Sequence, residues 1–215
     1  MIKNVVLVLM QIKGISRKTI YRSFEIDKRE YSINDIPVLF QKTAIKDVKI
    51  RIPSVREVEE AVDRARSIEK KSEDLGIKIV TCIDENFPDK LRKISDPPAV
   101  LYYKGDLAII NRWAVGVIGT REPTEYGIKV AENLGYVLGR DGYTIVGGLA
   151  YGCDKSGHIG CLKANGKTVA VMAGGLDKIY PAKHKDIAEQ IVVSGGCLLS
   201  EYPVGTRTFQ NFFIE

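Results

Sequence analysis

Cysteine, histidine and tryptophan are scarce in this 215-residue sequence, which contains four, two and one of them, respectively. The cysteines include no Cys-x-x-Cys pair and do not cluster with the histidines; they are Cys82, Cys153, Cys161 and Cys197. A zinc site or a disulfide framework would need such spacing. We therefore expect a protein of the reducing cytoplasm that carries no metal and no other cofactor.

Long hydrophobic runs and low-complexity tracts are also missing. The apolar run near the N-terminus, from Asn4 to Met10, is much shorter than the roughly 20 residues that span a bilayer. No small-residue cleavage site follows it. It is expected to form a first, buried helix. Hydrophobic residues make up 45% of the chain and charged residues 27%, a composition typical of a soluble globular protein.

A strong charge of one sign is lacking as well. The formal net charge is +5, and nearly all of this excess lies in the first 75 residues. Global charge therefore cannot attract a polyanion to the rest of the chain. A nucleic-acid site there would need a local concentration of cations.

Residues 1–75 are predicted to form a small all-helical domain. Apolar residues recur there at three- and four-residue spacing, interrupted by Gly14, Pro37 and Pro53. The tripeptide Gly14-Ile15-Ser16 is similar to the turn of helix-hairpin-helix or sterile-alpha-motif modules, which can hold DNA phosphates. An ordinary connection between two helices is the more common explanation of such a tripeptide.

From residue 76 onward, short apolar strands alternate with helices, which predicts an α/β fold with a parallel sheet. The expected strands are 77–81, 100–103, 114–118, 143–146, 168–172 and 197–200, and the expected helices are 89–94, 126–140, 155–164 and 185–193. Because no further strand follows 197–200, we expect that strand to lie at an open edge of the sheet, where Phe212 and Phe213 would extend an apolar margin.

The loop after strand 114–118 is the first candidate site, because ligands bind beyond the carboxyl ends of parallel strands. It reads Gly119-Thr120-Arg121-Glu-Pro-Thr124 and leads into a helix. Glycine permits close approach, a helix start offers free amides, and arginine adds a fork of donors. These features predict a cradle for an anion such as phosphate.

Two more glycine-rich loops are expected at the same edge, one containing Gly148 and Gly152 and the other containing Gly174 and Gly175. Glycines at these positions are also common in plain strand-to-helix turns. The sequence contains neither the dinucleotide pattern Gly-x-Gly-x-x-Gly nor a Walker loop, so NAD binding and ATP hydrolysis are not indicated.

Five elements in order resemble the DNA-processing protein A family, also called DprA or Smf. They are Asp96-Pro97-Pro98 with Leu101-Tyr102-Tyr103-Lys104-Gly105, then Gly119-Thr120-Arg121, Gly148-Leu149-Ala150-Tyr151-Gly152-Cys153-Asp154, Gly175-Leu176-Asp177 with Tyr180-Pro181, and Ser200-Glu201-Tyr202-Pro203. The resemblance runs from about residue 76 to the end of the sequence. It implies a Rossmann-like domain.

The resemblance further implies a protein that binds single-stranded DNA, protects it and helps load a RecA-type recombinase during natural transformation, without catalysis. It implies a homodimer in the full-length form and a continuation past Glu215 with an Arg-Asn-Arg pattern. Carried over by position, the DNA-binding residues are Gly119, Thr120, Arg121, Lys183, Arg207 and Phe209. A cationic groove with an exposed ring would bind single strands with little sequence preference.

Other interpretations remain open at this point. Asp154, His158, Asp177 and Glu201 form a conceivable acid–base set, although capping and bracing of loops is the more common role of such residues. Cys153 beside His158 resembles a nucleophile pair only in its spacing. A nucleotide-binding or nucleotide-hydrolysing enzyme of the same superfamily and a nucleotide-sensing module are the alternative functions.

Overall fold

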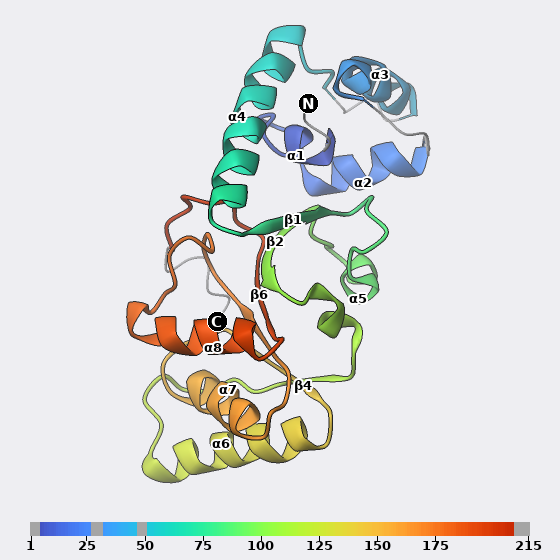
Figure 1. Cartoon of the computed structure of the whole chain (residues 1–215). Coiled ribbons are helices and arrows are strands. Elements are labelled where there is room, and N and C mark those ends of the chain that lie inside the picture. Colours follow the sequence, from blue (N-terminus) through green and yellow to red (C-terminus); the bar gives the residue numbers. More distant parts are fainter. Residues whose placement is uncertain (1–4, 27–31, 47–50, 209–215) are drawn as a thin grey trace. The chain divides into compact units, whose positions relative to one another are not determined.

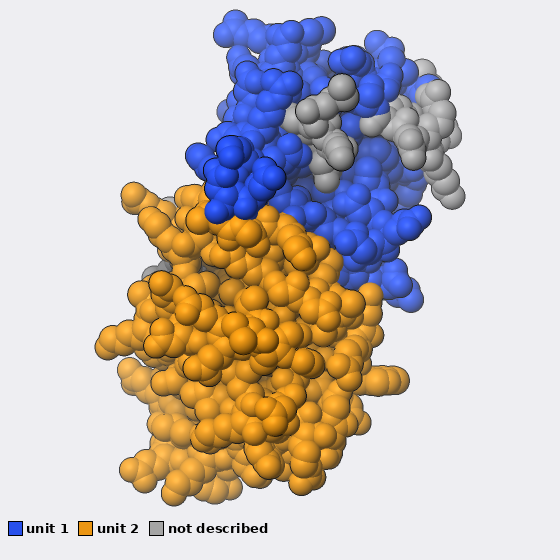
Figure 2. Space-filling model, in the orientation of Figure 1, with its two compact units in different colours: residues 1–74, 79–101 blue, residues 75–78, 102–215 orange. Residues whose placement is uncertain are grey.

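The computed structural model describes residues 5–26, 32–46 and 51–208, and they form two compact units. Unit 1 comprises residues 1–74 and 79–101, and unit 2 comprises residues 75–78 and 102–215; Figure 2 colours them separately. Residues 79–101 thus group with the N-terminal helices. The expected domain boundary near residue 75 stays a prediction.

Unit 1 is mainly helical, and its helical elements are α1 (Val5–Leu9), α2 (Arg17–Ile26), a 3-10 turn (Ile33–Asp35), α3 (Ile36–Lys46), α4 (Val55–Asp74) and α5 (Asp89–Arg92). Every residue of α1 is buried, as its apolar sequence predicts. Ser54 and Glu57 determine where α4 begins, because each side chain accepts the backbone N–H of the other, at 3.3 and 2.9 Å. None of the described helices is long and apolar enough to span a membrane.

The strands of the chain form one six-stranded sheet (Figure 1). Its strands are β1 (Lys78–Thr81), β2 (Val100–Gly105), β3 (Ala114–Gly116), β4 (Thr144–Gly147), β5 (Thr168–Val171) and β6 (Cys197–Ser200), in the spatial order β1-β2-β6-β5-β4-β3. The connecting elements of unit 2 are a 3-10 turn (Leu107–Asn111), α6 (Glu125–Arg140), α7 (Cys153–Lys163), a 3-10 turn (Ala182–His184) and α8 (Lys185–Val193).

The mixed α/β class predicted from the sequence is confirmed, and β3, β4, β5 and β6 run parallel in chain order. Two details differ from expectation. First, β2 pairs antiparallel with β6, so that Tyr102 faces Ser200. Second, β6 is therefore not an open edge: β2 covers its outer side, whereas β3 ends the sheet. Periodicity reveals that a strand exists, but it does not reveal the neighbour with which the strand pairs.

The helices of unit 2 pack against one another beside the sheet. α6 contacts α7 along its length, and α7 contacts α8 and strands β4 and β5. This arrangement follows from right-handed crossovers that all advance in one direction across the sheet, because each crossover then leaves its helix on the same face. A core of Val117, Ala131, Ile145 and Cys161 lies between α6, α7 and the sheet.

The amino end of α6 is fixed just after the first candidate loop. The hydroxyl of Thr124 accepts the backbone N–H of Gly127 at 3.2 Å. The helix dipole favours the negative Glu125 in the first turn and the positive Arg140 in the last turn. The helix start thus positions the loop that precedes it.

Candidate functional site

The carboxyl ends of β3, β4, β5 and β6 meet at one edge of unit 2, because these four strands are parallel neighbours. Four connecting segments leave the sheet there: residues 117–124, 148–152, 172–181 and 201–208. We call them together the loop cluster. The glycine-rich loops predicted from the sequence are the first three of these segments.

The first two segments are joined by their backbones. The N–H of Cys153 donates to the carbonyl oxygen of Thr120 at 3.2 Å. Gly152 makes this contact possible, since it has a φ of +79° and a Cβ at this position would lie 2.2 Å from the same oxygen. The approach also involves Gly119, where a Cβ would lie 2.8 Å from the sulfur of Cys153. Only glycine fits at either contact without a shift of the loops.

The second segment is held from both sides by side chains. A carboxylate oxygen of Asp154 accepts the N–H of Gly148 at 2.7 Å. Nδ1 of the buried His184 lies 2.8 Å from the carbonyl oxygen of Leu149. A carbonyl can only accept, so Nδ1 of His184 carries the proton. Leu149 itself is fully buried and has a φ of +56°, a conformation that these contacts maintain.

The third and fourth segments are joined in the same way. The N–H of Gly175 donates to the carbonyl oxygen of Thr206 at 3.0 Å. A carboxylate oxygen of Asp177 accepts the N–H of Gly205 at 2.9 Å. The hydroxyl of Ser200 donates to Gly174 at 2.8 Å. The loop cluster is therefore a preorganised framework of backbone contacts, not a set of independent turns.

Two hollows open on this framework, and Arg121 and Tyr151 line both. The larger has a volume of about 630 Å³ and is also lined by Glu122, Pro123, Ile128, Glu132, Gly152, Lys155, Ser156 and Ile159. The smaller, of about 20 Å³, is completed by Ala150, Tyr180 and Pro181. Arg121 thus stands where the two hollows meet.

Cations and carboxylates are equal in number in the lining of the larger hollow. Its lining includes the cations Arg121 and Lys155 and the carboxylates Glu122 and Glu132. Glu132 is paired with Lys163, a third cation on the adjacent helix. Because Lys163 neutralises Glu132, only Glu122 offsets Arg121 and Lys155 in the lining, and this local balance favours an anion such as a phosphate group at the rim.

Several polar residues of the loop cluster have structural partners. Asp154 and Asp177 brace Gly148 and Gly205, as described above, which is the bracing of loops expected for such residues. His158 is fully buried, and burial, followed by the charge of His184, lowers its pKa to about 4. Its Nδ1 lies 2.6 Å from Thr168 Oγ1, which donates to Ile145 O at 2.8 Å.

Cys153 and His158 have separate surroundings. The sulfur of Cys153 packs against Gly119, whereas the ring of His158 lies beneath Gly147, where a Cβ would be 3.0 Å from Nε2. Within the described residues no hydrogen bond joins the two side chains. Cys153 and His158 are five residues apart in α7, about one and a half helical turns, so their side chains leave the helix on different faces.

The structure gives a position to five of the six residues predicted to bind DNA. Gly119, Thr120 and Arg121 are exposed on the first loop, and Thr120 Oγ1 accepts the N–H of Glu122 at 3.2 Å. Lys183 is exposed two residues after Pro181, and Arg207 is exposed beside Thr206, which binds Gly175. Phe209 lies outside the described residues.

Three residues of the hollows were missed by sequence reasoning: Tyr151, Lys155 and Tyr180. Tyr151 and Tyr180 fall inside the motifs quoted above, where they read as spacers between glycines, aspartates and proline. Lys155 follows Asp154 in a helix whose other residues are mostly buried. An aromatic or cationic residue next to a glycine-rich loop was the signal available for all three.

Fold and site together define a Rossmann-like α/β protein whose loop cluster surrounds an exposed arginine. Residues 78–215 match the family model described as DNA recombination-mediator protein A. The chain belongs to this family.

Similar proteins agree with this assignment. Protein Smf from Synechocystis is 42% identical over 140 residues, which cover 63% of this chain and 35% of Smf. The X-ray structure of DNA processing protein A from Streptococcus pneumoniae has a TM-score of 0.74 and 25% identity, covering 99% of this chain and 72% of that chain.

A second solved structure concerns a relative that binds single-stranded DNA. It gives insights into the single-stranded DNA binding mode of DNA processing protein A from Helicobacter pylori. The TM-score is 0.56 and the identity 30%, with coverage of 64% of this chain and 60% of that chain. The present chain spans about a third of the length of the Synechocystis relative.

Proposed function

We propose that the loop cluster of unit 2 binds single-stranded DNA through its phosphates and bases, and that the protein takes part in DNA processing as a binding protein. The observation that carries this proposal is Arg121, an exposed guanidinium at the junction of two hollows in a preorganised loop framework. Arginine suits phosphate because its planar donors match the oxygens of the anion.

Three further features support the proposal. Lys155 contributes a second cation to the larger hollow. Arg207 is exposed on the fourth segment of the loop cluster, and Lys183 is exposed just after the third. The family relationship and the ligand of the Helicobacter pylori relative point to the same class of ligand. Loading of a RecA-type recombinase and dimer formation by the full-length protein are the finer parts of the proposal.

The role of Arg121 is tested by its replacement with alanine. If Arg121 contacts one phosphate, Arg121→Ala weakens the binding of all single-stranded sequences alike and lowers the slope of log affinity against log salt by about 0.7. Fluorescence anisotropy with a labelled oligothymidylate over a salt series measures both quantities.

Arg140→Ala is the matched control, because Arg140 is an exposed arginine at the far end of α6, paired with Asp141. It should leave affinity and salt slope unchanged. Equal binding by wild type and Arg121→Ala, with equal slopes, would show that the phosphate site lies elsewhere.

A further inference from the structure

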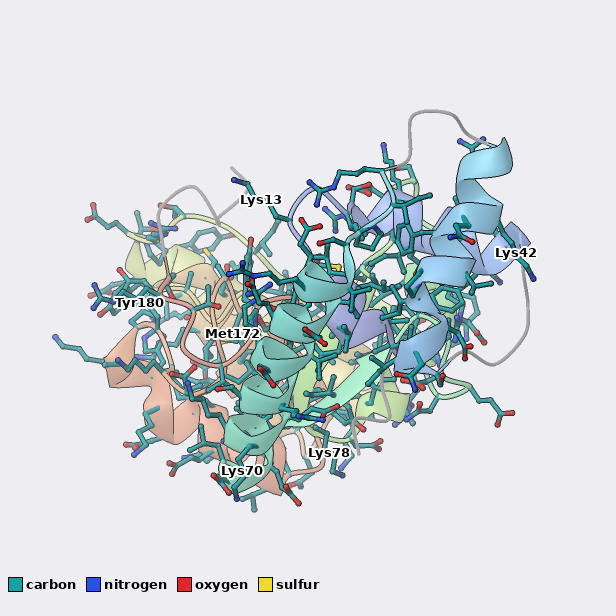
Figure 3. The ribbon with its side chains drawn as sticks, turned by 90° about the horizontal axis from the view of Figure 1, so that it is seen from above. Lys13, Lys42, Lys70, Lys78, Met172 and Tyr180 are labelled. Carbon is teal, nitrogen blue, oxygen red and sulfur yellow. The ribbon has the colours of Figure 1, made fainter. Side chains whose placement is uncertain are left out.

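Two tyrosines border Arg121 and retain much of their exposure. Tyr151 is 42% exposed and Tyr180 is 53% exposed. Both line the smaller hollow together with Arg121, and Tyr151 also lines the larger one. Figure 3 labels Tyr180 near the margin of the view, and its exposed fraction leaves the side chain accessible to a ligand.

The ring of Tyr151 is held in place from beneath. It makes an edge-to-face contact with His184, with 4.9 Å between ring centroids and an angle of 71°. His184 is in turn fixed at two points. Its ring Nδ1 donates to the carbonyl oxygen of Leu149, and its backbone N–H donates to the carbonyl oxygen of Pro181 at 2.9 Å. An aromatic ring that is already immobilised loses little conformational entropy when a base stacks on it.

The position of Tyr180 is coupled to the same anchor. It precedes Pro181, which lines the smaller hollow and whose carbonyl oxygen binds the N–H of His184. His184 therefore connects the loop that carries Tyr151 with the segment that carries Tyr180. Phosphates and bases alternate along a single strand, so a cation bordered by two exposed rings matches that alternation.

We propose that Tyr151 and Tyr180 are stacking sites for nucleobases on either side of a phosphate bound by Arg121. This inference rests on the proposed function and deepens it, because it assigns the recognition of bases to two particular rings. Stacking accepts any base, so the site would bind single strands with little sequence preference and would exclude paired bases, whose faces are already covered.

The test compares a base-bearing oligothymidylate with an abasic oligomer of equal length and charge. Wild-type protein should bind the base-bearing strand more tightly, by about tenfold for each ring that stacks. Tyr151→Leu and Tyr180→Leu should each lose about one such factor for the base-bearing strand while affinity for the abasic strand and the salt slope stay unchanged.

Tyr151→Phe and Tyr180→Phe keep the rings and should retain the preference. Tyr143→Leu is the matched control, an exposed tyrosine that precedes β4 at the opposite end of the strand. Thermal melts identify any variant that is destabilised. If Tyr151→Leu unfolds because it lacks the ring contact with His184, Tyr180→Leu still tests base stacking independently.

The outcomes separate this inference from the proposed function. If wild-type protein binds neither oligomer, the proposed function is wrong. If it binds both equally, DNA binding stands but base stacking is overturned. If it prefers the base-bearing strand and both leucine variants keep that preference, stacking occurs on other residues and the assignment to the two tyrosines is overturned.

Discussion

At the level of single residues, the loop cluster depends on backbone contacts that side chains would block. Gly152 illustrates this most clearly, since it combines a left-handed φ of +79° with an approach to the carbonyl oxygen of Thr120. Its conformation brings the second loop against the loop that carries Arg121. The glycine is therefore a structural part of the proposed phosphate site, although it offers no charge.

Gly152→Ala should destabilise the protein by roughly 3 kcal/mol or more, because the added Cβ must displace backbone atoms as well as adopt a strained φ. Gly142→Ala is the matched control, with a φ of +87° and nothing within 4 Å of the added atom. It should cost only the strain of the left-handed conformation, about 1 kcal/mol. Urea denaturation measures both; equal losses would show that the contact with Thr120 is unimportant.

His158 gives the folded state a dependence on pH. Burial lowers its pKa from 6.5 to about 4, so the unfolded chain binds a proton at a higher pH than the folded chain does. The stabilisation is complete above pH 6.5 and is lost as the pH falls towards 4, by up to about 3 kcal/mol.

His158→Gln should remove this part of the pH dependence, because glutamine does not titrate. The measurement is the difference in the free energy of unfolding between wild type and variant from pH 7.5 to pH 4. The two curves should converge as the pH falls through this window. Parallel curves would mean that His158 binds its proton equally well in the folded and unfolded states.

At the level of elements, the sheet ends at β3, and this position has a consequence for association. The carbonyl of Trp113 and the N–H of Val117 bind β4, so by alternation the backbone groups of Ala114 and Gly116 point away from β4. Edge groups of this kind can pair with another chain. The exposed apolar side chain of Ile118, which is 76% exposed, lies just beyond the strand.

Ala114→Pro should reduce self-association, because proline removes the outward N–H of an edge strand without disturbing the bonds to β4. Ala114→Val keeps that N–H and is the control. Light scattering over a concentration series measures the association. If the valine and proline variants associate to the same extent as wild type, β3 is not the edge that pairs.

Element prediction from the sequence succeeded where the pattern is local. β6 and α8 have the predicted bounds, Cys197–Ser200 and Lys185–Val193, and α1 is the buried helix expected from its apolar run. Sheet order was less accessible. The antiparallel insertion of β2 beside β6 depends on contacts between residues nearly a hundred positions apart, and no periodicity encodes them.

The candidate site shows the same division between what is local and what is not. The loop of Gly119 and Arg121 was found from its glycine, its arginine and the helix that follows. Tyr151 and Tyr180 were missed because their relevance arises only when separate segments bring them beside Arg121. Exposure and proximity of this kind are properties of the folded chain, whereas motifs record the residues that build the loops.

At the level of the whole molecule, the proposed DNA binding involves unit 2. The turn at Gly14, considered as a second DNA contact, remains a prediction. In the structure the hydroxyl of Ser16 accepts the N–H of Thr19 at 3.2 Å, so this residue already serves the start of α2. The proposed function therefore depends on the loop cluster and on the kind of ligand it holds.

A competition experiment with the whole chain and a labelled single-stranded oligothymidylate decides between the candidate ligands. Unlabelled single strands should displace the label, whereas a duplex of equal length should compete much less well and mononucleotides at millimolar concentration should not compete. That result supports a site that holds several phosphates and bases at once. Displacement by a mononucleotide at micromolar concentration would contradict DNA binding by the loop cluster and identify it as a nucleotide site instead.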